Sequence, residues 1–309
     1  MNRVSTSGTY QSALLNLMNA QTRQNDAQTR VSTQKNATDM AGFGRGAESL
    51  TALKAASSRV QGFLSTGEAV AARLETQDMA LNQVGDGITA ARAAIGNVLA
   101  SDSAEVLMLD LRGQFQQIQN GLNAKHQGVY LFAGGNTSQA PVNVSTMSEL
   151  AAAPDVASTF DNDALTPSSR LGEGRSVQTG YLANDVGASI FQIFRDIQAY
   201  NDDPATGPLS GKPNDAQKAF LTAQLSRLDA VGQSTIDAIA RNGALAKQVE
   251  TTNTSHAAQI EALDAMVNNK TDADLAKAVT DLQLSQVAVQ ASAQVLSTLN
   301  QTSLLNYLR

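Results

Sequence analysis

Few residues in this chain have types and spacings that could perform chemistry. Only two histidines are present, His126 and His256, and no Gly-x-Ser-x-Gly nucleophile elbow accompanies them. The chain has no cysteine, which excludes disulfides, thiolate catalysis and cysteine-based metal sites. Lone histidines are more often packing or hydrogen-bonding residues. His256 shares a helical seam with Asn253, and this placement indicates a role in fixing helix register.

The glycine-rich and acidic segments also lack the features of a ligand site. Residues 42–46 superficially resemble a phosphate loop, but no strand precedes them and the third glycine is misplaced, so a hinge is favoured. Gly211-Lys212 is followed by proline instead of the Ser or Thr of a phosphate loop. The acidic segment 161–163 lacks the glycine and distal glutamate of a calcium loop. We therefore predict no catalytic, cofactor-binding or metal-binding residues, no cofactor and no enzymatic activity.

The composition is that of a structural helical protein. With 309 residues the chain exceeds what one core usually holds, so two or three domains are expected. Apolar residues make up 42% but aromatic residues only 4%, and a core rich in Ala, Leu and Val suits close helix packing. Charged residues make up 16%, below the usual quarter, which favours long polar interfaces over charged surfaces.

The net charge of −6 is unevenly distributed. Residues 1–60 carry seven basic and three acidic side chains, a balance of +4, so the remainder carries −10. A basic arm can bind nucleic acid, but these bases are spaced out without aromatic residues between them, and we expect no such binding. No apolar run approaches the ~18 residues of a membrane helix, so we expect no membrane insertion. The N-terminus lacks an apolar signal core, so export would need a route without a cleaved signal peptide.

Two helical seams are visible in the first half of the chain. The apolar residues from Leu74 to Val98 mostly follow alternating three- and four-residue steps, the spacing of a coiled-coil seam. The glycines within 85–87 interrupt it, which indicates a weak point or a close helix approach. A second run from Leu111 to Leu122 repeats the spacing, and Asp102 with Glu105 predicts the start of its helix.

The middle of the chain changes character before the helical patterns return. Residues 128–135 have the pattern of a short β-strand closed by a glycine turn, and 136–181 are rich in Pro, Gly, Ser, Thr and Asn. A helix is predicted for 183–200. A longer one is predicted from Asp215, with Ile236 on its apolar face. Thr271 or Asp272 is predicted to cap the last helix.

We therefore predict a mainly α fold in which long antiparallel helices from both chain halves form a coiled-coil-like rod, with a small β-containing inserted domain. The expected domains are a terminal-helix assembly domain (1–40 plus 271–309), a helical rod domain (41–133 plus 183–270) and the insert (134–182). The terminal helices carry too little apolar surface to offset their ordering entropy alone. We expect both termini to be mobile in the monomer and helical in an assembly. Strong amide protection of residues 1–34 in the monomer would contradict this.

Four segments carry a family resemblance. They are Arg3 to Tyr10 (RVSTSGTY), Gly128 to Gly134 (GVYLFAG), Asp272 to Leu282 and Ser303 to Leu308 (SLLNYL), and together they cover both ends and the centre of the chain. In this order they resemble the bacterial flagellar hook–filament junction family, hook-associated protein 3, within the flagellin-like superfamily. Residues 38–44 depart from the family, which often has an Asp-Asp-Pro-type turn there.

The resemblance implies a secreted structural adaptor. Such proteins form a ring-like homo-oligomer between hook-associated protein 1 and the first flagellin subunits, with terminal helices lining the tube and a variable insert facing outward. They leave the cell unfolded through the flagellar export apparatus, escorted by an export chaperone, without signal cleavage. The implied location is extracellular, at the hook–filament junction of the flagellum.

Two other interpretations remain open. Flagellin, the filament subunit itself, shares the architecture but usually opens differently and lacks the Tyr-Leu-Phe-Ala-Gly step. A cytosolic coiled-coil signalling protein has similar heptads but needs neither the insert nor a helix at each extreme end. The residues expected to join terminal helices within and between subunits are large and apolar: Leu14, Leu17, Leu282, Val289, Leu296, Leu304, Leu305 and Leu308.

Overall fold

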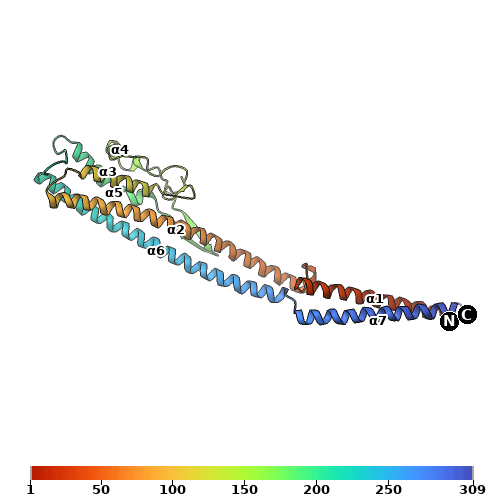
Figure 1. Ribbon diagram of the computed structural model, residues 1–309. Helices are drawn as coiled ribbons and strands as arrows, with labels where there is room; N and C mark the ends of the chain where they lie inside the picture. The colour runs from red at the N-terminus through yellow and green to blue at the C-terminus, as the bar shows by residue number, and fades with distance from the viewer. Residues whose placement is uncertain (1, 308–309) are drawn as a thin grey trace. The chain divides into compact units, whose positions relative to one another are not determined.

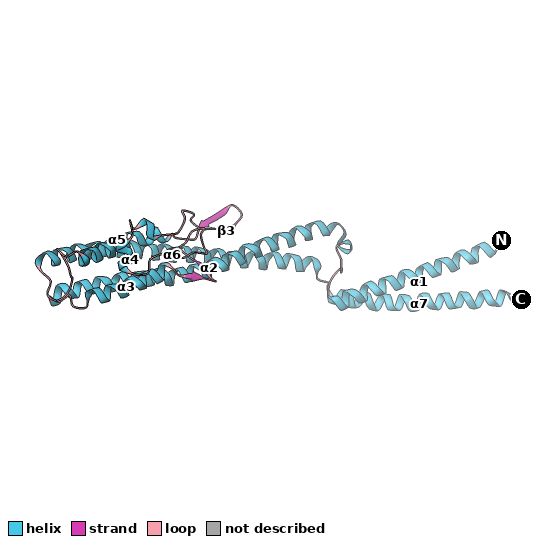
Figure 2. Cartoon of the chain, turned by 90° about the horizontal axis from the view of Figure 1, so that it is seen from above, coloured by secondary structure: helices cyan, strands magenta, loops and turns pink. Residues whose placement is uncertain are grey.

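The computed structural model describes the backbone of residues 2–307 and the side chains of residues 8–301. The fold is mainly helical, as predicted, with long helices from both chain halves paired side by side and two small sheets (Figure 1, Figure 2). The elements in chain order are α1 (Asn2–Thr33), η1 (Ala41–Gly46), α2 (Ala47–Ser101), α3 (Leu107–Leu122), β1 (Lys125–His126), β2 (Val129–Tyr130), α4 (Met147–Ala152), η2 (Ala157–Thr159), β3 (Ser168–Gly172), β4 (Arg175–Gln178), α5 (Ala183–Asp202), α6 (Asp215–Thr271) and α7 (Leu275–Tyr307).

The chain forms two compact units. The terminal unit comprises residues 1–59 and 259–309, and the central unit comprises residues 60–258. The long helices α2 and α6 each contribute residues to both units. These two units do not test the three domains that the sequence predicts, and that division stays a prediction.

The core of the central unit lies between α2, α3, α5 and α6. Phe115 of α3 is fully buried, and its ring lies 5.0 Å from Phe191 and 5.6 Å from Phe194 of α5. The same core takes in Phe132 and Met147 from the chain between α3 and α5. Figures 1 and 2 both draw α3 and α5 beside the α2·α6 pair. The few aromatic rings of the chain are thus concentrated where four helices meet.

Close packing of α3 on α2 depends on glycine. A Cβ atom on Gly121 would stand 2.9 Å from the Val84 Cγ2 atom and 3.0 Å from the Ala80 carbonyl oxygen. A Cβ atom on Gly87 would stand 2.6 Å from the Ile118 Cγ1 atom. The glycines within 85–87 therefore include one at a close helix approach, the second of the two alternatives indicated by the sequence.

This contact makes a first prediction. Gly121→Ala should destabilise the central unit by about 1–2 kcal/mol, because the overpacking cost exceeds the gain in helix propensity. Gly113→Ala, on the same helix with nothing within 4 Å of the added Cβ atom, should instead stabilise it by about 0.5–1 kcal/mol. Urea unfolding of both variants measures the difference, and equal effects would contradict the close approach.

The start of α3 differs from the prediction. The helix begins at Leu107, and its N-cap residue Val106 makes no side-chain capping hydrogen bond. Asp102 has a positive φ of 57°, and its carboxylate pairs instead with Lys212, at 2.9 Å, and with Lys218. Asp102 therefore ties the end of α2 to the start of α6.

Two predictions for the C-terminal half are also wrong. Asp274, and not Thr271 or Asp272, caps α7, because the Lys277 amide donates to the Asp274 Oδ1 atom at 3.1 Å. Ile236 is 58% exposed, because the residue on the buried face of α6 at this point is Thr235, one position earlier. The buried face of α6 is therefore out of phase with the prediction by one residue. The cap of α7 lies two or three residues after the predicted positions.

The α2·α6 pair has a polar seam in its middle. The Gln77 side chain donates to the Asn242 Oδ1 atom at 2.8 Å, and both residues are buried. The Nε2–H of His256 donates to the Leu171 carbonyl oxygen at 2.7 Å, and its ring stacks on Phe63 at 5.9 Å. His256 therefore holds β3 against α6, and its role in fixing helix register stays a prediction.

The other residues considered for chemistry have structural contacts. The His126 Nδ1 atom lies 2.8 Å from the Thr76 hydroxyl oxygen. The Asp163 carboxylate accepts the amides of Gly135 and Leu165, at 2.8 and 2.9 Å, and these hydrogen bonds lower its pKa. Within the described part of the chain, no group of three or more His, Asp or Glu residues could hold a metal ion. None of the described helices has the length and hydropathy needed to cross a membrane.

Candidate assembly interface

The terminal helices α1 and α7 pack against each other along a seam of small side chains. On α1, Ala13, Ala20 and Ala27 are at most 9% exposed and recur every seven residues, which places them on one face. On α7, Ala278 and Ser285 are buried with the same spacing. The expected pairing of the two chain ends is therefore present (Figure 1). Small side chains bury little apolar area, so this pairing contributes little stability by itself.

Several large apolar side chains of the terminal pair point away from this seam. Five of them are more than half exposed: Leu15, Met18, Leu284, Val287 and Val295. Isolated exposed apolar residues are normal on proteins, but a group of this kind on one helix pair marks an interaction surface. The terminal pair therefore presents to solvent the kind of side chain that usually fills a core.

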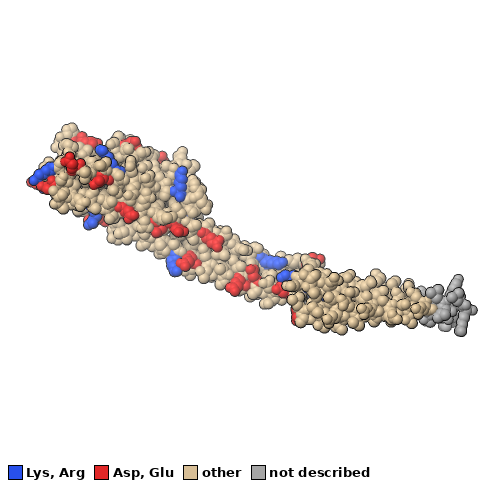
Figure 3. All heavy atoms as spheres, in the orientation of Figure 1, with Lys and Arg blue, Asp and Glu red and all other residues tan. Residues whose placement is uncertain are grey.

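The same part of the chain is almost free of charge. No Lys, Arg, Asp or Glu occurs in residues 4–22 or in residues 282–308. Figure 3 shows this face of the α1·α7 pair without blue or red atoms over most of the described length, in contrast to the central unit. Depletion of charge together with exposed aliphatic side chains is the composition of the middle of a protein–protein interface.

The predicted interface residues fall into two groups. Leu14 is 40% exposed, while Leu17, Leu282, Val289 and Leu296 are half-buried. Leu282, Val289 and Leu296 recur every seven residues and so lie on one line along α7. The side chains of Leu304, Leu305 and Leu308 lie outside the described residues. Whether any of these residues contacts another subunit stays a prediction.

Sequence reasoning missed the five most exposed apolar residues of the pair. Periodicity selects the residues that face the seam, and these five do not belong to it. The usable signal was the pair of charge-free segments, 4–22 and 282–308, because all five residues lie within them.

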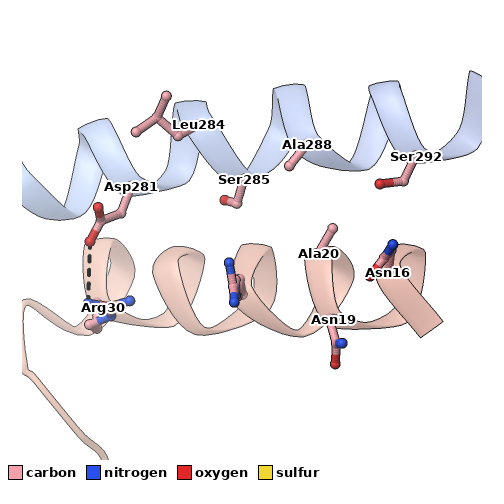
Figure 4. A pocket seen from close by; sticks show the side chains of 10 residues that line it. Asn16, Asn19, Ala20, Arg30, Asp281, Leu284, Ser285, Ala288 and Ser292 are labelled. Atoms are coloured by element: carbon pink, nitrogen blue, oxygen red, sulfur yellow. Dashed lines mark ion pairs between the residues drawn. The ribbon is translucent and has the colours of Figure 1, made fainter. Parts of the chain in front are cut away.

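A groove of about 600 Å³ runs along one side of the terminal pair (Figure 4). Its small lining residues are Ala20, Ser285, Ala288 and Ser292, which Figure 4 draws between the two helices. The remaining lining residues are Asn16, Asn19, Arg23, Arg30, Asp281 and Leu284. An ion pair of 3.6 Å between Arg30 and Asp281 closes one end of the groove.

A clasp joins the loop after α1 to the segment between α6 and α7. The Asn36 amide donates to the Thr271 carbonyl oxygen at 2.7 Å, and the Ala273 amide donates to the Gln34 carbonyl oxygen at 2.9 Å. The Asn36 side chain also donates to the Asp272 carbonyl oxygen, at 2.8 Å. These bonds keep the start of α7 beside the end of α1 despite the weak seam.

The clasp carries a pH dependence. A hydrogen bond from the Lys35 ammonium group holds the pKa of Asp272 below its usual value. A carboxyl group with a lowered folded-state pKa stabilises the fold above its unfolded pKa, and this stabilisation is lost as the pH falls through the folded pKa.

We expect the clasp to loosen as the pH falls below about 4, the ordinary pKa of aspartate, and on through the lower folded-state pKa of Asp272. The measurement is hydrogen exchange at the Asn36 and Ala273 amides, relative to the hydrogen-bonded Thr179 amide of the central unit. The Asp272→Asn variant should lose most of this relative pH dependence. An unchanged profile in the variant would contradict the assignment to Asp272.

Comparisons with known proteins agree with this geometry. Residues 225–308 match the family model of the bacterial flagellin C-terminal helical region. A structure described as a flagellar hook-associated protein of Vibrio parahaemolyticus superposes with a TM-score of 0.59 at 15% identity, covering 76% of this chain and 99% of its own. The crystal structure of Bacillus cereus FlgL gives a TM-score of 0.53 at 15% identity, with coverage of 71% and 98%. No curated protein matches the sequence.

The matched region contains most of α6 and all of α7, including one side of the small-residue seam and of the groove. Residues 225–308 are therefore flagellin-like, which agrees with the prediction of a structural protein and not an enzyme. The overall fold of the chain is that of the flagellar hook-associated proteins, the FlgL type among them.

Proposed function

We propose that this protein is the structural adaptor that joins the flagellar hook to the flagellin filament. Its fold resembles the hook-associated proteins over more than 70% of the chain. The observation that carries the proposal is the terminal pair, whose small residues face inward while Leu15, Met18 and Val287 face solvent. A helix pair built in this way reaches a low-energy state only when neighbouring subunits cover it.

The proposal includes partners and location. The protein would contact copies of itself in a ring, hook-associated protein 1 on the hook side and flagellin on the filament side. It would leave the cell through the flagellar export apparatus with a chaperone and without signal cleavage, and act outside the cell. The domain division proposed from the sequence, with an outward-facing insert at 134–182, would place the variable part away from the subunit contacts.

Flagellin itself is the second candidate, favoured by the match of residues 225–308 to the flagellin C-terminal region. Electron microscopy of cells lacking the protein separates the two. An adaptor leaves hooks without filaments and flagellin in the medium, whereas loss of only part of the filament mass would identify a filament subunit.

A truncation supplies a second test. Deletion of residues 304–309 should leave the melting of the central unit unchanged, because none of its core residues lies there. The same deletion should abolish incorporation at the hook, because it removes three large apolar residues that we expect at subunit contacts. Normal filaments on normal hooks from the truncated protein would contradict the proposed role of the C-terminal segment.

A further inference from the structure

A buried pair of side-chain amides lies between α2 and α6 in the central unit. Gln77 and Asn242 are 0% and 1% exposed, and the Gln77 Nε2 group donates to the Asn242 Oδ1 atom at 2.8 Å. The Asn242 Nδ2 group donates in turn to the Leu74 carbonyl oxygen of α2 at 3.0 Å. The Gln77 Oε1 atom is buried without a hydrogen-bond partner among the described residues. Burial of an unpaired acceptor costs stability, so stability alone does not account for the pair.

The amide pair lies just beyond the four-helix core. At the level of Val84 on α2, α3 ends with Gly121 in close approach, and α5 begins nearby, where a Cβ atom on Gly187 would stand 2.7 Å from the Leu122 Cδ1 atom. From this level on, α2 and α6 continue past α3 and α5 (Figure 1). Their alignment there depends mainly on the contacts that the two helices make with each other.

A second point of close contact lies about three helical turns before Gln77 on α2. A Cβ atom on Gly67 would overlap the Asn253 side chain of α6, which therefore fills the space that the glycine leaves. Between the two points lies a small apolar cluster, made of Val70, Leu74 and Val249 with Leu171 of β3. The cluster is thus bounded along the helix pair by one polar contact and one glycine contact.

The apolar contacts of these helices do not by themselves select one alignment, because hydrophobic attraction is not directional. The amides do discriminate. A displacement of α6 by one turn in either direction would place the Gln77 amide against Leu245 or Ile239, and Asn242 would likewise face a leucine of α2. Both amides would then be buried without partners, at the full cost of their desolvation. The Asn253 side chain would also meet a residue that has a Cβ atom.

We propose that Gln77 and Asn242, together with Gly67 and Asn253, are positioning residues that hold α2 and α6 in a single alignment at a cost in stability. A polar residue within an apolar seam fixes the register of paired helices in this way. The role belongs to the single chain and is independent of the proposed function. Its consequence is that every copy presents the same surface of the central unit.

The test measures the alignment in the purified full-length chain with nitroxide labels. Because the chain has no native cysteine, labels attach only at two introduced positions, Gln61→Cys on α2 and Gln248→Cys on α6, which are both exposed. Pulsed electron paramagnetic resonance gives the distribution of distances between the labels. We expect one distance in the labelled parent. The variant Gln77→Leu with Asn242→Leu should show a second distance that differs by up to about 5 Å, the rise of one helical turn.

The matched control removes a different pair of amide contacts in the same labelled chain. Gln83 and Gln117 join α2 to α3 inside the four-helix core, where each side chain donates to the carbonyl oxygen of the other residue, at 3.3 and 3.2 Å. Gln83→Leu with Gln117→Leu should therefore keep one distance. A single distance in the Gln77→Leu, Asn242→Leu variant, or a second distance in the control, would overturn the proposal. If the leucine pair fails to fold by circular dichroism, methionine at both positions replaces it, since methionine is unbranched and flexible.

Urea unfolding gives an independent measurement. Asn242→Leu alone leaves the buried Gln77 amide without its acceptor and should lower the urea midpoint. Addition of Gln77→Leu should return the midpoint at least to that of the parent, because a packed apolar pair needs no hydrogen bonds. A double variant less stable than Asn242→Leu alone would overturn the proposal, because the amide pair would then serve stability and not alignment.

Discussion

Ala20→Leu is expected to open the terminal helix pair while the central unit remains folded. Ala20 is 7% exposed on the α1 side of the α1·α7 seam, and Ser285 on the α7 side is also buried. Overpacking a closely packed site costs about 1–3 kcal/mol. The seam of small residues stabilises the helix pair only weakly, so this cost should be enough to separate α1 from α7. Under the proposed function, incorporation into the flagellum should be lost as a consequence, because the terminal pair is the proposed assembly surface.

Hydrogen exchange of peptides within residues 8–33 measures this opening. A cost of about 1–3 kcal/mol lowers amide protection roughly fivefold to a hundredfold or more. Gln21→Leu is the matched control, since it adds the same side chain at the next, exposed position and should leave protection unchanged. If Ala20→Leu kept full protection across α1, the small-residue seam would not be what holds the two helices together.

Phe115→Ala is expected to produce the largest loss of stability in the central unit. The Phe115 ring is fully buried beside Phe191 and Phe194 in a cluster of apolar side chains, so its removal should leave a largely apolar cavity that holds water poorly. Removal of a buried phenylalanine ring costs about 3–5 kcal/mol. For a unit of this size, the midpoint of thermal unfolding should fall by roughly 6–20 °C.

Circular dichroism of the full chain checks this expectation, with Leu109→Ala as the control. Leu109 lies on the same helix but is 70% exposed, so its truncation should change stability by less than about 0.5 kcal/mol. Equal effects of the two variants would mean that the core of the central unit does not depend on the three-ring cluster. Subunit contacts made by the terminal pair should be unaffected in either variant at temperatures where the central unit is folded.

The sequence predicted the helices better than their ends. The seam from Leu74 to Val98 lies within α2, and the helix expected at 183–200 is α5, because long periodic runs specify helix and buried face together. The capping predictions for α3 and α7 were wrong because caps depend on which partner is nearby in space. Asp102 forms ion pairs with two lysines at the start of α6, and Asp272 forms an ion pair with Lys35 in the loop after α1. These partners are more than 100 residues away along the chain.

The sequence by itself indicated the class of protein. The spacing of apolar residues in both halves predicted the long helices, and four segments in order carried the family resemblance, and neither signal needs coordinates. Only the tertiary structure decided which terminal residues are used inside the subunit and which remain free. The reason is geometric: a seam of alanine and serine brings α1 and α7 together, so that Leu15, Met18 and Val287 face outward. The period of the apolar residues alone cannot distinguish this arrangement from one in which the larger side chains form the seam.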